Sequence, residues 1–315
     1  MAQSDDMSAV VDDIAERVRR RLQAMKVGVE QPCTAKEPSR DASPPAGNRA
    51  SSPADAPGAQ CAPSCGDCSN HDSCGVSMSV RSGVSRIAPD RVRTSADIAP
   101  YIDHTLLKPE ATRDDVVKLA EEARKWGFAT VCVNSVHVGT AARILAGSKT
   151  VPIAVVGFPL GAALPSAKAF EAREAIRCGA REIDMVINIG ALKAKDYALV
   201  LKDIAAVVDA SKPHPVKVIL ETSQLDQDQK VAGCVLSKAG GAAFVKTSTG
   251  FTGGGATAED IALMRRIVGD DVGVKASGGI RSSEDAMAMI NAGANRIGAS
   301  ASVAIVTGKK SDSKY

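Results

Sequence analysis

The period of the apolar positions changes repeatedly along the chain after residue 99. Short apolar runs in which alternate residues share a face predict β-strands, whereas apolar residues spaced three or four apart predict helices. Strands are expected at 101–105, 129–134, 152–158, 182–188, 216–222, 243–248, 272–277 and 296–299. Helices are expected between them at 113–126, 136–146, 166–178, 195–210, 226–239, 258–268 and 283–292.

This alternation predicts a parallel sheet built from βα units. Capping signals mark several helix starts, for example Thr112 followed by Asp115 and Ser282 followed by Asp285. Eight βα units in roughly 215 residues fit a compact (β/α)8 TIM barrel, which we expect over residues 93–315. An open, doubly wound sheet is the alternative, but no G-x-G-x-x-G motif follows the first strand.

A separate amphipathic pattern occupies residues 1–25. Between residues 7 and 25, apolar side chains recur at helical spacing opposite a charged face; they are Val10, Val11, Ile14, Val18, Leu22 and Met25. A single helix of this length does not bury its own apolar face. We therefore expect this helix to need a partner surface that the neighbouring sequence does not offer.

Residues 26–92 are rich in Pro, Ser, Ala and Gly, a composition that predicts a disordered linker. Within this segment, four metal-ligating residue types recur every three positions: Cys65, Cys68, His71 and Cys74. Thiolate and imidazole ligands suit Zn²⁺ or an iron–sulfur cluster. The spacing matches no standard paired zinc signature, and a redox-sensitive patch without metal is the alternative.

Composition excludes several classes of protein. A net charge of +3 and 3% aromatic residues give little basis for nucleic-acid binding. No apolar run approaches the ~20 residues of a membrane span. The acidic start, with Asp5 and Asp6, is unlike a secretory signal, so a cytoplasmic protein is expected.

Charged residues near the carboxyl ends of several strands suggest chemistry, because barrel enzymes place their reactive groups there. The two-residue period of a strand places Asp184 inside the barrel, since Ile183 and Met185 occupy the opposite face. Lys246 and Lys275 end similar apolar runs in successive units. Lys217 opens its strand, so we expect it at the other end of the barrel in a structural role.

Two interior lysines near a carboxylate favour imine chemistry. A lysine with a pKa of ~10.4 is neutral in only about one molecule in 2,500 at pH 7, so it needs a lowered pKa to act as a nucleophile. A second ammonium ~4 Å away shifts the pKa by roughly three units at an effective dielectric of ~20. Asp184 would then relay protons. The alternative is that each lysine extends to solvent.

Glycines after the seventh and eighth strands predict a phosphate site. Gly278 and Gly279 bring backbone amides to the start of a helix, and Gly298 with Ser300 does the same after the last strand. Helix amino termini at these two places form the usual phosphate site of such barrels. Gly253-Gly254-Gly255 offers further amides.

Five segments resemble the deoxyribose-phosphate aldolase family over about residues 95–310. They are Ile102–Leu107, Val155–Pro159, Glu182–Val186, Phe244–Gly250 and Val274–Arg281. The resemblance implies a metal-free class I aldolase that reversibly cleaves 2-deoxy-D-ribose 5-phosphate to glyceraldehyde 3-phosphate and acetaldehyde. Other class I aldolases with a different phosphorylated sugar substrate remain an alternative.

The resemblance also implies roles for individual residues. Lys246 would form the Schiff base, Lys275 would activate it, and Asp184 would relay protons. The C-terminal Tyr315 would assist proton transfer, as a terminal tyrosine does in some family members. The expected substrate-binding residues are Asp103, Cys132, Thr247, Gly250, Gly278, Gly279, Gly298 and Ser300.

The segment before residue 93 departs from this family. A short amphipathic helix followed by a Pro/Ala/Ser-rich linker resembles the encapsulation peptides that direct enzymes into bacterial microcompartments. Residues 7–25 are therefore expected to bind shell or cargo proteins. An oligomerisation helix or a helix at a membrane surface is the alternative. We expect a homodimer, and a barrel that serves mainly as a scaffold is the alternative to an active enzyme.

Overall fold

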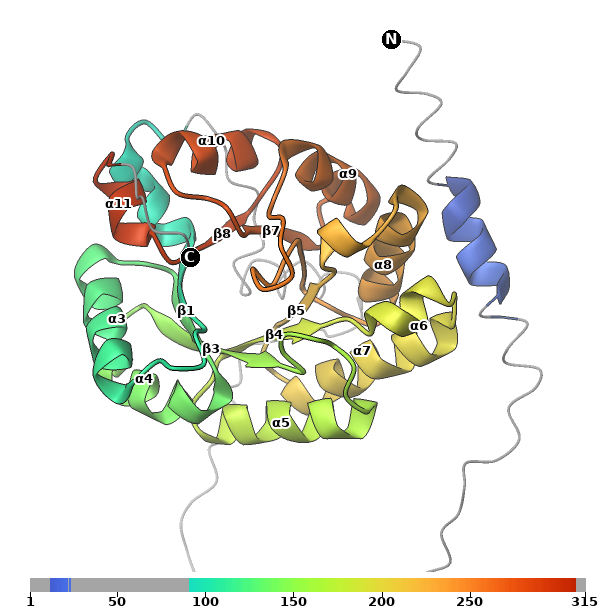
Figure 1. Cartoon of the computed structure of the whole chain (residues 1–315), viewed down its shortest axis with the longest axis horizontal. Helices are drawn as coiled ribbons and strands as arrows, with labels where there is room; N and C mark the ends of the chain where they lie inside the picture. Colours follow the sequence, from blue (N-terminus) through green and yellow to red (C-terminus); the bar gives the residue numbers. More distant parts are fainter. Residues whose placement is uncertain (1–11, 22, 24–90, 310–315) are drawn as a thin grey trace, which may run out of the picture.

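The computed structural model describes residues 12–21, 23 and 91–309. Eight parallel strands form a closed barrel in the order β1 to β8, each strand paired with its neighbours in the sequence and β8 paired with β1. Helices surround this barrel on its outside (Figure 1). The predicted (β/α)8 barrel is confirmed.

The strands are β1 (Ile102–Leu106), β2 (Thr130–Val133), β3 (Val151–Val156), β4 (Glu182–Val186), β5 (Val216–Ile219), β6 (Phe244–Lys246), β7 (Gly273–Ser277) and β8 (Arg296–Ala299). The α-helices are α3 (Arg113–Trp126), α4 (Val138–Leu145), α5 (Pro165–Arg177), α6 (Ile189–Lys193), α7 (Tyr197–Ser211), α8 (Gln227–Ala239), α9 (Ala258–Val268), α10 (Ser283–Asn291) and α11 (Ser302–Val306). Short 3₁₀ helices are η2 (Ser95–Tyr101), η3 (Ser135–His137) and η4 (Thr222–Gln224).

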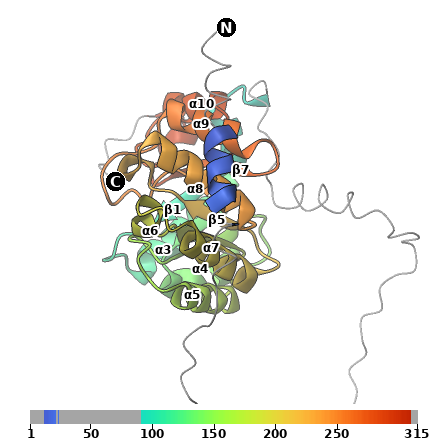
Figure 2. The same cartoon turned by 90° about the vertical axis from the view of Figure 1, so that its right-hand side faces the viewer.

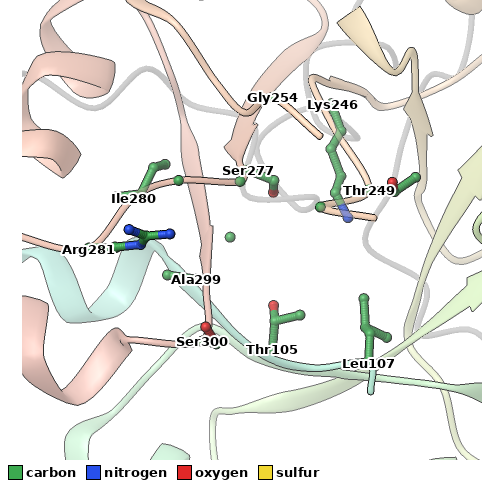
Figure 3. Close-up of a pocket in the computed structure, with 14 residues that line it drawn as sticks. Thr105, Leu107, Lys246, Thr249, Gly254, Ser277, Ile280, Arg281, Ala299 and Ser300 are labelled. Atoms are coloured by element: carbon green, nitrogen blue, oxygen red, sulfur yellow. The ribbon is translucent and has the colours of Figure 1, made fainter. Parts of the chain in front are cut away.

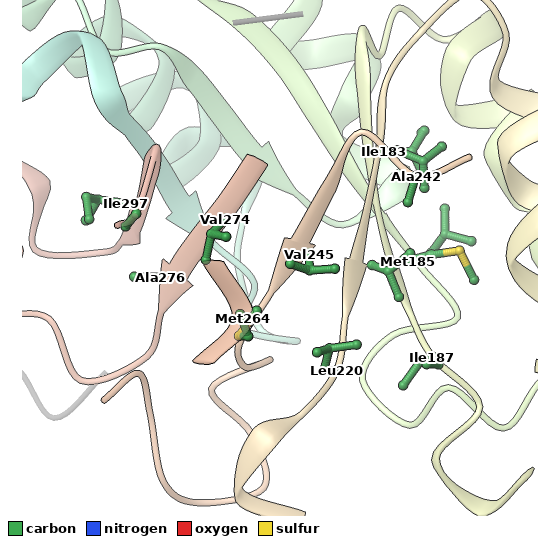
Figure 4. Packing of buried hydrophobic residues seen from close by; sticks show 14 of the residues in the cluster. Ile183, Met185, Ile187, Leu220, Ala242, Val245, Met264, Val274, Ala276 and Ile297 are labelled. Atoms are coloured by element: carbon green, nitrogen blue, oxygen red, sulfur yellow. The ribbon is translucent and has the colours of Figure 1, made fainter. Parts of the chain in front are cut away.

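The main core lies between the strands and the surrounding helices. Ile183 and Met185 of β4 point outward into this layer, where they are fully buried (Figure 4). Val245 of β6 and Val274 of β7 continue the same layer. The opposite faces of these strands point into the barrel, so the polar residues between the outward-facing ones are brought together there.

Local signals place the helices as expected. The Thr112 hydroxyl accepts a hydrogen bond from the Asp115 amide, and the Asp115 carboxylate accepts one from the Thr112 amide at 2.9 Å. The same capping box joins Ser282 and Asp285 at the start of α10. At the other end of α3, Gly127 adopts a left-handed φ of 69° that favours glycine. These signals define the helix starts in the sequence because they act over three residues.

The predicted N-terminal helix is present over residues 12–21, and the described part of its apolar face is covered by the barrel of the same chain, not by neighbouring sequence. Residues 12–21 form a helix that lies alongside α8 (Figures 1 and 2). Ile14 and Val18 are buried and belong to the same apolar cluster as the core of the barrel. The period of the helix did not indicate this surface because its residues are distant in sequence, and binding to shell or cargo proteins stays a prediction.

Several predicted features lie outside the described residues. They are the segment 24–90 with Cys65, Cys68, His71 and Cys74, the helix residues Val10 and Leu22, and Tyr315. None of the helices that the structure describes is both long enough and apolar enough to cross a membrane. Among residues 12–21, 23 and 91–309, no group of three or more His, Cys, Asp or Glu side chains is arranged to hold a metal ion.

Candidate active site

The two predicted lysines lie side by side on neighbouring strands. Lys246 ends β6 and pairs in register with Lys275 of β7. Because residues in register on neighbouring strands point to the same face, both side chains enter the barrel. Asp184 enters the barrel from β4, and all three side chains are buried.

Asp184 links the two lysines through one oxygen atom. Its Oδ2 atom accepts hydrogen bonds from the Nζ atoms of Lys246 at 2.9 Å and Lys275 at 2.8 Å. Lys275 also makes an ion pair with Asp103 at 2.6 Å. Lys275 thus has two carboxylate partners within the described residues, whereas Lys246 has one.

This difference in partners separates the pKa values of the two lysines. Burial lowers the pKa of Lys246 below its ordinary value, and the positive charge of Lys275 lowers it further, whereas Asp184 acts in the opposite direction. Burial also disfavours the charged form of Lys275, but Asp103 and Asp184 together hold the pKa of Lys275 above its ordinary value. Lys275 therefore stays an ammonium while Lys246 is the amine that loses its proton more readily.

The expected field of Lys275 is present, but burial is the larger cause of the lowered pKa of Lys246. Repulsion between the two ammonium groups would by itself lower the pKa of Lys246 enough only if no opposite charge lay beside them. Asp184 hydrogen-bonds to both lysines and offsets part of the repulsion. Desolvation in the barrel interior therefore contributes more than the neighbouring cation.

Lys217 joins the same network from the amino-terminal half of the barrel. The sequence placed it at that end in a structural role. Its side chain is fully buried and its Nζ atom reaches Asp184 Oδ1 at 3.1 Å, while it also pairs with Glu182. A lysine side chain is long enough to bridge two layers of the barrel, so its position on the strand does not fix where its charge lies.

Arg296 completes the network at the other end. Its guanidinium contacts Asp103 at 2.7 Å and Glu182 at 3.4 Å, and it lies 5.5 Å from the centre of the Phe244 ring. Burial raises the pKa of Asp184, yet the three lysines around it hold that pKa well below the ordinary value. Asp184 is therefore ionised throughout the physiological pH range.

The charges in this network balance only when one cation is neutral. Four basic side chains (Lys217, Lys246, Lys275 and Arg296) are connected to three carboxylates (Asp103, Asp184 and Glu182). An uncompensated buried charge is costly. Lys246 contacts a single carboxylate, whereas each of the other three basic groups contacts two, so Lys246 is the group whose charged form has the least support.

A cavity of about 170 Å³ opens beside the Lys246 amine at the carboxyl ends of the strands (Figure 3). Thr105 and Leu107 from the end of β1 and the residue after it line one side, and Thr249 lines another. Lys246 and Arg281 reach into this space from different sides (Figure 3). The cavity is therefore lined by the Lys246 amine on one side and by the Arg281 guanidinium on another.

The predicted phosphate site lies on this cavity. Five of the expected binding residues line it, namely Gly250, Gly278, Gly279, Gly298 and Ser300. A Cβ atom at Gly298 would collide with Ser277 Oγ and would lie 2.9 Å from Lys275 Cε. Glycine at this position therefore leaves room for the lysine beside the cavity as well as for a ligand.

Three other expected binding residues do not line the cavity. Thr247 uses its hydroxyl within the sheet, donating to Ser277 O at 2.9 Å and accepting from Ser277 N at 3.0 Å. Cys132 is buried in β2, and burial raises the pKa of its thiol to about 11, so it stays protonated. Asp103 contacts Lys275 and Arg296 inside the barrel and contributes to the charge network instead.

Glu221 is a residue of the site that the sequence did not indicate. It follows β5 with a φ of 59°, a left-handed conformation that is rare for residues other than glycine. Its buried carboxylate accepts hydrogen bonds from the amide and the hydroxyl of Thr249, which lines the cavity. Glu221 thereby fixes the start of the loop that carries Gly250, although no local motif marks it.

The fold and the site together define a barrel enzyme with a buried lysine on its cavity. Residues 98–310 match the DeoC/LacD family of aldolases, and the chain belongs to this family. The chain is 59% identical over 223 residues to a deoxyribose-phosphate aldolase of Halalkalibacterium halodurans, a match that covers 70% of this chain and 100% of that protein. A deoxyribose-phosphate aldolase of Macrococcus caseolyticus is 57% identical over 219 residues, with coverage of 70% and 100%.

Solved structures agree with the family. The deoxyribose-phosphate aldolase of Aeropyrum pernix, described as a tetramer, is 32% identical with a TM-score of 0.65, and the match covers 73% of this chain and 96% of that one. The matched family region begins after the predicted linker, so it leaves the N-terminal helix unassigned. A homodimer of this chain stays a prediction.

Proposed function

We propose that this protein is a class I aldolase that cleaves 2-deoxy-D-ribose 5-phosphate to D-glyceraldehyde 3-phosphate and acetaldehyde. The observation that carries the proposal is the pairing of Lys246, whose pKa is lowered, with the ammonium of Lys275 through a shared Asp184 oxygen. The relatives named deoxyribose-phosphate aldolase support the choice of substrate. No metal or cofactor is required by this chemistry.

The reaction begins when the neutral amine of Lys246 adds to the C1 aldehyde of the open-chain sugar. A proton moves from the nitrogen to the C1 oxygen to give a neutral carbinolamine. The carbinolamine hydroxyl then takes up one further proton from solvent and leaves as water, which gives the iminium ion. Asp184 is the acceptor within hydrogen-bond reach of the nitrogen, at 2.9 Å, and is the residue placed to carry this proton. Lys217 and Lys275 hold the pKa of Asp184 low, so that its carboxylate stays ionised for this purpose.

The second stage breaks the C2–C3 bond. The C3 hydroxyl loses its proton, its oxygen becomes the aldehyde of glyceraldehyde 3-phosphate, and the bonding electron pair moves to the iminium as an enamine. The enamine is then protonated at C2, and water releases acetaldehyde. The charges of the network balance when the nitrogen of Lys246 is uncharged. The network therefore destabilises the positive iminium, as it does the ammonium, and favours movement of the electron pair onto that nitrogen.

The other end of the cavity suits the phosphate of the substrate. The amides of Gly278 and Gly279 precede α10, and Ser300 precedes α11. Arg281 adds a positive charge to the lining of the same cavity. Binding energy from this end holds the sugar in position while the aldehyde reacts with Lys246.

Borohydride trapping tests the Schiff base. Reduction in the presence of acetaldehyde should leave an ethyl group on Lys246, because only a neutral amine beside the cavity condenses with the aldehyde. Peptide mass spectrometry locates the adduct, and the Lys246→Met variant serves as the control. An adduct on Lys275 or Lys217, or active protein without any adduct, would contradict the assignment.

We also propose that the N-terminal segment directs the enzyme to a bacterial microcompartment in the cytoplasm. The amphipathic pattern of residues 7–25 supports this proposal, since such helices bind grooves of partner proteins. Fused to a fluorescent protein, this segment should co-localise with compartment shells in a host that makes them. Ile14→Asp combined with Val18→Asp should disperse the signal; unchanged co-localisation would refute the docking role.

A further inference from the structure

The N-terminal helix already occupies a surface of the barrel. Ile14 and Val18 are only 4% and 1% exposed, and they lie one helical turn apart on the same face. Ala15 beside them is also buried. By contrast, Asp12, Asp13, Arg19 and Arg20 on the other side are exposed. The burial of one face therefore shows a specific orientation against the barrel.

Two contacts of basic side chains accompany the buried face. The guanidinium of Arg17 lies 3.7 Å from the carboxylate of Asp228 in the first turn of α8. One turn later, the guanidinium of Arg21 lies 6.0 Å from the centre of the ring of Tyr197, the first residue of α7. Both partners belong to the amino-terminal ends of barrel helices, and an acidic side chain such as Asp228 is favourable at such an end.

The surface of the barrel thus matches the helix both in apolar contact and in charge. Charged pairs on an exposed surface contribute little affinity, so Arg17 and Asp228 chiefly set the direction of the helix. The buried aliphatic side chains supply the attraction. A helix of this length does not persist alone in water, so its structure depends on this contact.

We propose that the start of α7 and the start of α8 form a receptor surface for an amphipathic helix, and that residues 12–21 of the same chain occupy it. The contact buries Ile14 and Val18, which are the side chains that any other partner of this helix would bind. A protein that binds this helix must therefore compete with the barrel. This contact lies apart from the cavity that Lys246 lines, so it does not depend on the aldolase chemistry.

The covalent connection favours occupation by the same chain. Residues 24–90 join the helix to the barrel, and a chain segment can span up to ~3.3 Å per residue when extended. A tethered segment that reaches its site binds as if present at roughly millimolar concentration. A weak helix–surface contact is therefore filled within the chain in preference to one from a second molecule.

Hydrogen exchange on the full-length protein tests this contact. Amides in residues 16–21 should exchange at least about 10-fold more slowly in the wild type than in Val18→Asp, because the undocked helix melts. Arg19→Asp is the matched control, since it introduces the same residue one position away on the exposed face. Equal exchange in Val18→Asp and wild type would overturn the proposal.

Peptide binding identifies the receptor surface. A fluorescent peptide of residues 7–25 should bind full-length Val18→Asp, whose surface is vacant, at least about 10-fold more tightly than it binds the wild type. Asp228→Arg added to Val18→Asp should weaken that binding. Equal affinity for wild type and Val18→Asp, or no binding to Val18→Asp, would refute occupation of this surface by the helix.

The concentration dependence distinguishes the same chain from a second copy. Protection within one chain should not change on about 100-fold dilution of the protein. Loss of protection on dilution would show that the helix comes from another molecule and would overturn the proposal. Aldolase turnover of Val18→Asp should match the wild type, since neither end of the contact lines the catalytic cavity.

Discussion

Lys246→Met should reduce aldolase activity by roughly 10⁴-fold or more while the protein keeps its fold. The variant has no amine beside the cavity, and loss of a covalent nucleophile has effects on this order in enzymes whose catalytic groups act as a unit. Methionine fills a similar volume in the barrel. The remaining network then holds three basic groups and three carboxylates, and no carboxylate loses all its partners.

Stability should respond in the opposite direction from activity. The folded protein holds the pKa of Lys246 below its ordinary value of 10.5, so the unfolded chain binds more protons between those two pKa values. The stability of the wild type therefore rises with pH through this window. Lys246→Met lacks that dependence, and it should be at least as stable as the wild type at neutral pH, with an advantage that shrinks as pH rises.

Steady-state kinetics and urea denaturation at several pH values measure both effects. Circular dichroism provides the control for folding. Residual activity within about 10-fold of the wild type would exclude Lys246 as the nucleophile. The expected result is a stability difference, variant minus wild type, that is larger at neutral pH than at high pH. The opposite order would contradict the charge balance of the network.

Lys275→Met should lower activity at pH 7 by roughly 10²–10³-fold and move the acid limb of the pH–rate profile upward. Removal of Lys275 leaves Lys217, Lys246 and Arg296 with three carboxylates, so the network is balanced when Lys246 is protonated. The Lys275 ammonium also no longer lowers the pKa of Lys246. A larger fraction of Lys246 is then charged at pH 7 and does not react.

The measurement is kcat/KM from pH 5 to the alkaline limit at which the variant stays folded. Activity should recover partly as the pH rises, since Lys246 itself is still present. Lys168→Met is the matched control: Lys168 is a fully buried lysine paired with Asp203 at 2.5 Å, outside the barrel interior. Its loss should destabilise the fold without shifting the profile. Coincident profiles for wild type and Lys275→Met would refute the role of Lys275.

The fold was largely predictable because its signals are local and repeated. Each strand showed an apolar run, and helices such as α3 began at a capping residue that acts over three positions. The short helices α6 and α11 were not predicted. They contain five residues each, which is too few to show a helical period.

The site was predictable where the strand period alone fixes direction. Asp184, Lys246 and Lys275 lie on inward faces of their strands, as expected. Glu221 and Arg296 were missed because their partners are distant in sequence. Glu221 contacts Thr249 in a neighbouring unit, and Arg296 contacts Asp103 across the closure of the barrel between β8 and β1.

The N-terminal helix shows the same limit on a larger scale. Its amphipathic period was visible, and the helix is present, but the period does not reveal which surface covers the apolar face. Ile14 and Val18 belong to the apolar cluster of the barrel, and Arg17 and Arg21 beside them contact the first turns of α8 and α7, far along the chain. An unpaired apolar face in a sequence therefore indicates that a partner exists without showing whether it is another protein.

The single connected network inside the barrel also constrains how this sequence can diverge. Replacing one basic residue of the network changes the charge that every other member experiences, so single substitutions at these positions should be selected against even where the residue does not touch substrate. Compensated exchanges, such as the joint loss of Lys217 and Glu182, keep the balance. Among diverging descendants of this barrel, acidic and basic interior positions should therefore vary as linked pairs, and a library for directed evolution should randomise them together.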